Sequence, residues 1–273
     1  MVGSVAAGLL LLACAFVVQE LRAPDPVMPL RLLRMPVVRS CAATTFLIGS
    51  VNFLVVAFLP LMLQVVTGVG STEAGLAILP TTFGIAVTST AVGRLVVRTG
   101  HYRSWPVLGS VVFTAGFAVL ASLGSDPSRL AVWSGTGLLG IGMGAGTPVF
   151  MLAMQNAVAH RDVGVVSSTA MFARNTGQAF GTAIGGALFA ARLTDHLHRL
   201  VSPTQLDGLD LTAVRGDIPA IRALDAEVQA LVAEAFRLAV TDVFTVGVVM
   251  AALSVAVAAT IPQLRLRETL DSS

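Results

Sequence analysis

Residues 42–66 read AATTFLIGSVNFLVVAFLPLMLQVV, a stretch of 25 residues without a single charged side chain. A helix needs roughly 20 mainly apolar residues to cross about 30 Å of hydrocarbon. Backbone polar groups in lipid must be bonded within the segment, which favours a helix over an open strand. The stretch therefore predicts a membrane-spanning α-helix.

Segments of the same kind recur along the whole chain. Of the 273 residues, 55% are apolar and 12% are charged, whereas soluble domains carry about 25% charged residues. We therefore expect an all-α polytopic membrane protein with about seven transmembrane helices. The apolar stretches that predict them lie near residues 2–18, 42–66, 74–97, 105–123, 131–154, 164–191 and 238–261.

These spans divide the chain into six expected parts. They are a first transmembrane helix (1–19), a cytoplasmic linker (20–41), a five-helix membrane bundle (42–192), an extracytoplasmic loop (193–237), a last transmembrane helix (238–262) and a cytoplasmic tail (263–273). Within the extracytoplasmic loop, apolar residues recur at helical spacing and predict an amphipathic surface helix leading into the last span. These residues are Ile221, Leu224, Val228, Leu231, Val232 and Phe236.

The arginines predict an orientation in the membrane. Six of them lie on the side of the membrane that carries the long loop, and ten lie on the opposite side. The positive-inside rule makes the side with ten arginines cytoplasmic. The C-terminus is then cytoplasmic. The Arg-only, Ala-rich composition suggests a GC-rich bacterial gene, so we expect a protein of the bacterial inner membrane. The chain would begin outside without the basic start of a signal peptide, so we expect further spans before residue 1. The arginines on the cytoplasmic side are Arg22, Arg31, Arg34, Arg39, Arg94, Arg98, Arg103, Arg161, Arg265 and Arg267.

Composition and motifs argue against several function classes. The chain has no lysine, which rules out Schiff-base chemistry and a retinylidene photoreceptor. A net charge of +2 gives no footprint for nucleic acid. The glycines at 135–140 match a dinucleotide-binding pattern, but no strand precedes them, so they indicate helix packing. His196 and His198 are expected to be solvated loop residues. We expect no enzyme, no cofactor and no metal site.

Polar residues inside the spans or at their ends are the candidates for a transport pathway or for coupling. Burying an arginine at the centre of a membrane helix costs about 2.5–3.5 kcal/mol on insertion scales, so Arg174 needs an explanation. Two interpretations stay open: its side chain faces a cavity or partner, or it extends to the cytoplasmic surface about 15 Å away. The candidates are Asn52, Gln64, Gln155, Asn156, Arg174, Asn175, Gln178 and Asp242.

Glycines spaced by four residues predict smooth helix faces that allow close helix packing. In the sixth expected span these are Gly177, Gly181 and Gly185, and in the fifth they are Gly140 and Gly144.

The residues after the third expected span resemble a known motif. Residues 93–103 read GRLVVRTGHYR, which resembles the signature loop of the major facilitator superfamily, with Val97 at the position of the signature's aspartate. The stretches MPLRLLR (28–34), LPLMLQ (59–64), TEAGLAILP (72–80) and QNAV (155–158) are similar to the fourteen-helix drug:proton antiporters of that superfamily. The signature-loop candidates are Gly93, Arg94, Leu95, Arg98, Gly100 and Arg103.

The resemblance implies that the chain is the C-terminal portion, helices eight to fourteen, of a multidrug exporter. It also implies alternating access about a midplane site and export of hydrophobic or cationic small molecules, antibiotics included, in exchange for protons. The acidic groups usually tied to proton coupling belong to the first half of such proteins. We therefore expect this chain to be inactive alone, with the lipid bilayer and a missing N-terminal half or a second copy as its partners.

Two other function classes fit a seven-helix membrane protein. One is a membrane receptor, against which the facilitator-like loop argues. The other is a scaffold protein that transports nothing.

Overall fold

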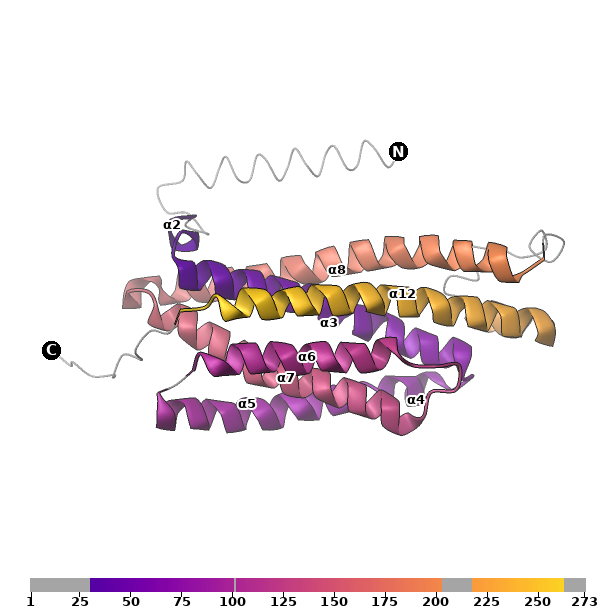
Figure 1. Ribbon diagram of the computed structural model, residues 1–273, viewed down its shortest axis with the longest axis horizontal. Helices are drawn as coiled ribbons and strands as arrows, with labels where there is room; N and C mark the ends of the chain where they lie inside the picture. The colour runs from indigo at the N-terminus through magenta and orange to yellow at the C-terminus, as the bar shows by residue number, and fades with distance from the viewer. Residues whose placement is uncertain (1–29, 101, 203–217, 263–273) are drawn as a thin grey trace.

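The computed structural model describes residues 30–100, 102–202 and 218–262 (Figure 1). The regular elements in these residues are all helical. The expected first span and the expected C-terminal tail lie outside them, as does Arg22. The helices are α2 (Leu30–Leu33), α3 (Pro36–Val66), α4 (Ser71–Leu76), α5 (Leu79–Thr99), α6 (Ser104–Ala121), α7 (Arg129–Asn156), the 3-10 turn η1 (His160–Asp162), α8 (Val163–Leu200), α11 (Ile218–Arg222) and α12 (Ala226–Ala259).

The long helices form two layers of three. Helix α7 lies between α5 and α6, and helices α3, α8 and α12 pack against one another. Contacts of α12 with α6 and of α3 with α7 join the two layers. All six helices run roughly along the long axis of the molecule (Figure 1). The helical membrane bundle expected from the sequence is confirmed.

Five segments in the described part of the chain are long and apolar enough to cross a membrane. They are Pro36–Val66, Ser71–Thr99, Ser104–Ala121, Arg129–Asn156 and Ala226–Ala259. Helix α8 has 38 residues but is less apolar than these five. Polar residues from Ser167 to Thr182 lower its hydropathy.

Several helix ends differ from the expected bounds for a physical reason. Helix α8 continues to Leu200 because Leu193 and Leu197, one turn apart, remain buried on the same face. Helix α12 begins at Ala226 and runs unbroken into the last span. The amphipathic pattern expected for a surface helix leading into the last span lies largely in the first turns of α12, where Val232 and Phe236 are buried.

Aromatic side chains join the helices inside the bundle. Phe117 of α6 meets Phe244 of α12 edge to face with ring centroids 6.1 Å apart. In the other layer, Phe189 of α8 contacts Phe58 of α3 at 5.1 Å and Phe236 of α12 at 4.9 Å. Such pairs add about 0.5–1.5 kcal/mol beyond the burial of their area.

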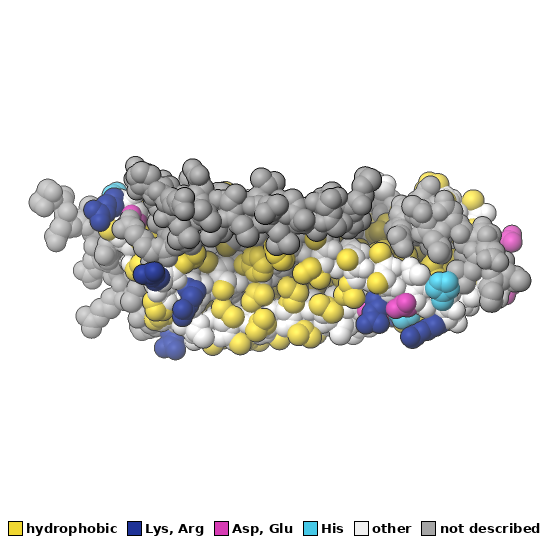
Figure 2. Space-filling view, turned by 90° about the horizontal axis from the view of Figure 1, so that it is seen from above, with side chains coloured by type: hydrophobic (Ala, Val, Ile, Leu, Met, Phe, Trp, Pro, Cys, Tyr) yellow, Lys and Arg dark blue, Asp and Glu magenta, His cyan; other side chains and the backbone are white. Residues whose placement is uncertain are grey.

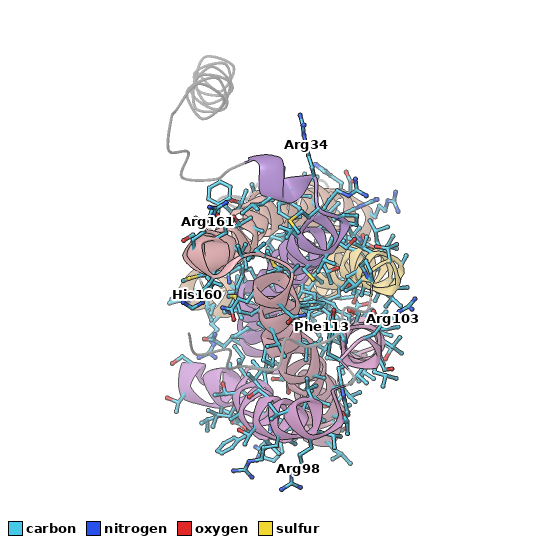
Figure 3. The ribbon with its side chains drawn as sticks, turned by 90° about the vertical axis from the view of Figure 1, so that its left-hand side faces the viewer. Arg34, Arg98, Arg103, Phe113, His160 and Arg161 are labelled. Atoms are coloured by element: carbon cyan, nitrogen blue, oxygen red, sulfur yellow. The ribbon has the colours of Figure 1, made fainter. Side chains whose placement is uncertain are left out.

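Charge separates to the two ends of the bundle. Arg34, Arg98, Arg103 and Arg161 lie at the end viewed in Figure 3. Hydrophobic side chains cover the middle of the face seen in Figure 2, and charged side chains gather toward both of its ends. We call the end with these four arginines the basic end and the other the distal end. An apolar band between charged ends is the pattern expected of a protein that crosses a bilayer.

Candidate functional site

Helices α3 and α8 approach each other closely along a row of glycines. Gly177 lies against the backbone of Phe46, Gly181 against the backbone of Ser50 and Gly185 against the side chain of Leu54. Both helices advance by four residues at each contact, so the glycine face predicted from the sequence meets a matching row on α3. A methyl group at Gly181 would overlap the Ser50 carbonyl, which leaves no room for any larger residue.

The same close approach places Arg174 beside α3. The missing side chain of Gly49 lets α3 reach the main chain of α8, since a Cβ atom there would lie 2.6 Å from the Arg174 carbonyl oxygen. Arg174 itself is exposed, and it lines a narrow hollow with Asn52 and Thr45 of α3 and Thr147 of α7. The sequence-predicted residues Asn52 and Arg174 therefore share one site, which we call the Arg174 hollow.

Gly49, Thr45 and Thr147 did not stand out in the sequence. Glycine and threonine are common in membrane helices and usually serve packing there. The signal that would have found Thr147 is its neighbour Pro148, since a proline inside α7 removes a backbone hydrogen bond at that level.

Gln155 lies on α7 at its contact with α8, nearer the basic end than the Arg174 hollow. Its Nε2 donates to the hydroxyl of Ser167 at 3.0 Å, which joins α7 to α8. Asn156 follows it as the last residue of α7 and is half-buried. The Gln155 bond gives the α7–α8 contact a polar link that the sequence did not predict, because Ser167 is an ordinary helical serine whose own hydroxyl also bonds to the Val163 carbonyl.

The remaining candidates lie away from the hollow. The Gln64 side chain donates to the Pro60 carbonyl one turn earlier, at 3.2 Å, so its bond is local. Asn175 and Gln178 follow Arg174 on α8, with Asn175 exposed and Gln178 half-buried, and neither lines the hollow. Asp242 is on α12 at the level of His196, which is about 33 Å along α8 from Arg174. The sequence-predicted polar residues thus form several small groups.

Asp242 has partners on the neighbouring helix. Its carboxylate lies 3.0 Å from the His196 imidazole and 3.6 Å from the Arg192 guanidinium, both on α8. His196 is therefore a half-buried helical residue in an interhelical pair, which differs from the solvated loop residue expected. The pair ties α8 to α12 toward the distal end.

Glycines also bring α5 and α7 together. Gly140 lies against the backbone of Thr81, and a Cβ atom at Gly144 would come within 2.8 Å of the Ile85 carbonyl oxygen. The Thr81 hydroxyl donates to the Thr136 carbonyl across the same contact at 2.9 Å. These residues fix the position of α5, which carries the signature loop at its end.

The signature loop forms the turn between α5 and α6 at the basic end. Gly100 has a φ of +68°, a left-handed conformation that favours glycine, and its N–H caps α5 at the Val96 carbonyl. The next described residue, Tyr102, is fully buried and donates to the Pro262 carbonyl at 3.2 Å, so the loop contacts the segment that follows α12. Sequence reasoning missed Tyr102.

Unlike Tyr102, the arginines and Gly93 of the signature loop are not buried inside the described bundle. Arg94, Arg98 and Arg103 are exposed, and the last two point away from the bundle in Figure 3. Leu95 is also exposed. Among the described residues, nothing lies within 4 Å of a Cβ atom added at Gly93. The loop therefore presents its arginines outward from this half of the bundle.

The Arg174 hollow offers hydrogen-bonding groups and one positive charge. None of its lining residues is acidic, and in the described part of the chain no three His, Cys, Asp or Glu residues gather as a metal site would require. This chemistry suits binding and charge pairing between helices.

Comparison with known proteins identifies the family. The family model of the Major Facilitator Superfamily matches residues 2–182, which is more than half of the chain. The chain belongs to the major facilitator superfamily. A solved bacterial homologue of the human lysosomal transporter Spinster, in an inward-facing and unoccupied conformation, superposes with a TM-score of 0.64 over 85% of this chain and 49% of that one. At 15% identity this likeness shows the fold alone.

Relatives in the superfamily include transporters of several organisms. An uncharacterised MFS-type transporter of Mycobacterium tuberculosis is 32% identical over 259 residues, covering 93% of this chain and 36% of that protein. The multidrug transporter protein MdtP of Bacillus subtilis is 31% identical over 187 residues, covering 67% and 34%. A tetracycline resistance determinant of Streptomyces rimosus is 30% identical, covering 77% and 61%. This major facilitator chain spans about a third of the length of the first two relatives.

Proposed function

We propose that this chain is the second half of a proton-coupled multidrug exporter in a bacterial cell membrane, with its C-terminus in the cytoplasm. The six long described helices make one two-layered bundle, and the superfamily fold pairs two such bundles around a central site. Relatives named as a multidrug transporter and a tetracycline resistance determinant support export of drug-like molecules. The arginines at the basic end support the orientation.

The observation that carries the proposal is the Arg174 hollow between α3, α7 and α8. It holds an exposed arginine within a membrane helix, with Asn52 and Thr147 beside it and no acidic residue in its lining. An unpaired charge in a bilayer is costly, so such a residue is expected to face a partner or a water-filled path. In the assembled exporter, a carboxylate of the other half pairs with Arg174 in one state and is released in the next.

The chain alone is expected to transport nothing. Alternating access needs a second bundle that rocks against the first about the substrate site. Exposed apolar side chains on α5 and α8, such as Phe83, Met171 and Phe180, offer surface for that second bundle. The other half is supplied by a longer form of this protein, by a separate chain or by a second copy of this chain.

Dye export from cells without their own exporters tests the proposal. The chain would be expressed alone and together with the part of the Bacillus subtilis multidrug transporter that precedes its matched segment, after membrane insertion is confirmed. We expect ethidium export at the level of empty vector for the chain alone, and protonophore-sensitive export for the pair. Export by the chain alone would contradict its assignment as half of a transporter.

Arg174→Ala tests the site within the same assay. We expect the paired system to lose export roughly tenfold, since a charge pair within the membrane is removed. The matched control is Arg199→Ala, which removes an exposed arginine from the same helix far from the hollow. Equal export by the two variants would contradict a role for Arg174.

A further inference from the structure

A second and larger cavity opens at the distal end of the bundle. Its volume is about 520 Å³, and its walls come from the end of α3, from α4, from the loop before α7 and from the first turn of α7. Small-molecule sites in proteins usually measure about 300–1,000 Å³. The cavity is thus large enough for a drug-sized ligand, unlike the Arg174 hollow, whose volume is about 10 Å³.

The lining combines apolar walls with charged side chains. Leu63, Leu76 and Trp133 supply apolar and aromatic surface, and Trp133 is 45% exposed. Glu73, Asp126 and Arg129 are the charged residues of the lining, so two negative charges and one positive charge leave it with a net charge of −1. An aromatic face beside a carboxylate is a favourable environment for an organic cation.

The charges are arranged so that one carboxylate remains for a ligand. Arg129 pairs with Glu73, and their side chains are 67% and 48% exposed. Exposed pairs of this kind contribute little to stability, so the pair is free to rearrange. The nearby Arg222 is already bonded to the carbonyls of Gly68 and Val69, at 3.1 and 3.4 Å. Asp126 is exposed in the loop before α7, which forms part of the cavity wall.

We propose that this cavity binds amphipathic monovalent organic cations, with the cationic group at Asp126 and the apolar body against Trp133 and Leu76. The site is distinct from the Arg174 hollow. Asn52 lines the hollow and Leu63 lines the cavity, which places the two about 16 Å apart along α3. A role for the distal cavity in contacting a drug that leaves the exporter rests on the proposed function. Binding of a cation in the cavity needs no transport.

The two tryptophans of the chain allow a direct test. Trp133 lines the cavity, and Trp105 lies at the start of α6, at the basic end. In the full-length Trp105→Phe variant, purified in detergent, fluorescence reports on the cavity alone. N-hexylpyridinium, a cationic quencher, is the probe. We expect saturable quenching, whereas partition into the micelle alone would give quenching that rises linearly.

Charge variants locate the cationic group. In the Trp105→Phe background, Asp126→Asn is expected to raise the dissociation constant roughly three- to tenfold, since one attractive charge is removed. The matched control Asp195→Asn removes an exposed carboxylate of α8, which is not in the lining, and should leave the constant unchanged. Linear quenching in the parent, or equal constants in these two variants, would overturn the proposal.

Competition keeps the test valid even if Asp126→Asn fails to fold. Hexyltrimethylammonium should displace the probe from the Trp105→Phe protein, and hexanol and hexanesulfonate at the same concentration should not. Displacement by all three would show a merely apolar cavity and overturn the assignment of a cation site. Binding with this selectivity, together with a lack of dye export by the paired system, would count against the proposed function alone.

Discussion

Helix α3 and the α4–α5 segment are both apolar enough to cross a membrane, yet their surroundings differ. The most apolar stretch of α3 has a mean hydropathy of 2.3, and 56% of it is buried inside the bundle. The most apolar stretch of Ser71–Thr99 has a mean hydropathy of 1.5, and 17% of it is buried. Lipid solvates apolar side chains as well as a protein core does, so apolarity alone does not decide which helix is central. The number of neighbouring helices decides it, since α3 packs on α7, α8 and α12, whereas α5 packs mainly on α7.

The contrast is clearest at single positions. Along α3, the backbones of Phe46 and Ser50 meet two glycines of α8, and the side chain of Leu54 meets a third. Along α5, one face packs on α7 while Phe83 and Val87 are each 67% exposed and Val97 is 79% exposed. The first region is determined within this chain, and the second leaves surface for lipid or another bundle.

The largest expected effect is at the α3–α8 contact. Gly181→Leu would drive a side chain into the Ser50 backbone, and because neither helix can yield without separating, we expect a loss of about 3 kcal/mol or more. Thermal unfolding in detergent, followed by size-exclusion chromatography, measures it. Gly186→Leu is the matched control on the same helix, since nothing lies within 4 Å of its Cβ position. Equal losses would mean that the close contact with Ser50 does not set the effect, since helix propensity favours leucine over glycine at both positions.

Sequence reasoning could predict one side of each contact. The spacing of Gly177, Gly181 and Gly185 predicted a packing face, and apolar length predicted the helices of the bundle. The partners were out of reach, because Asp242 and His196 are 46 residues apart and meet only when α12 lies beside α8. No local pattern encodes which helices become neighbours.

The candidate site was predicted only in part for the same reason. Arg174 and Asn52 stood out as polar residues within spans, but their shared hollow depends on Gly49, which the sequence shows as one glycine among 26. The distal cavity was not predicted, since its walls come from segments far apart in the chain. The sequence shows which residues are polar or charged, but only the packing of the helices shows which of them share a site.

A smaller effect is expected in the signature loop. Gly100→Ala places a Cβ atom on a residue with a φ of +68°, which costs about 1 kcal/mol. Gly93→Ala should have the opposite sign and stabilise by up to about 1 kcal/mol, because Gly93 lies inside α5 with open space around it among the described residues. Thermal unfolding of the two variants compares them. Destabilisation by Gly93→Ala would show that this face of α5 has a close neighbour.

The contact between His196 of α8 and Asp242 of α12 should contribute less. A double-mutant cycle with His196→Gln and Asp242→Asn is expected to give a coupling of roughly 0.5–1 kcal/mol, since the Asp242 side chain is 38% exposed and partly screened. Thermal unfolding of the four proteins of the cycle measures the coupling. Arg199→Ala combined with Asp242→Asn serves as a cycle without a contact, and the same coupling there would argue that the effect is not specific to the pair.

The smallest expected effect is on the exposed face of α5. Phe83→Ala should change the stability of this chain alone by no more than about 0.5 kcal/mol, because the ring contacts little of the bundle. The buried Phe113 of α6, labelled in Figure 3, is the reference, and its replacement by alanine should cost about 3–5 kcal/mol. If the second bundle covers α5, Phe83→Ala should weaken the paired assembly while leaving the single chain unchanged. Co-purification of the two parts would show it, and an unweakened pair would place α5 against lipid.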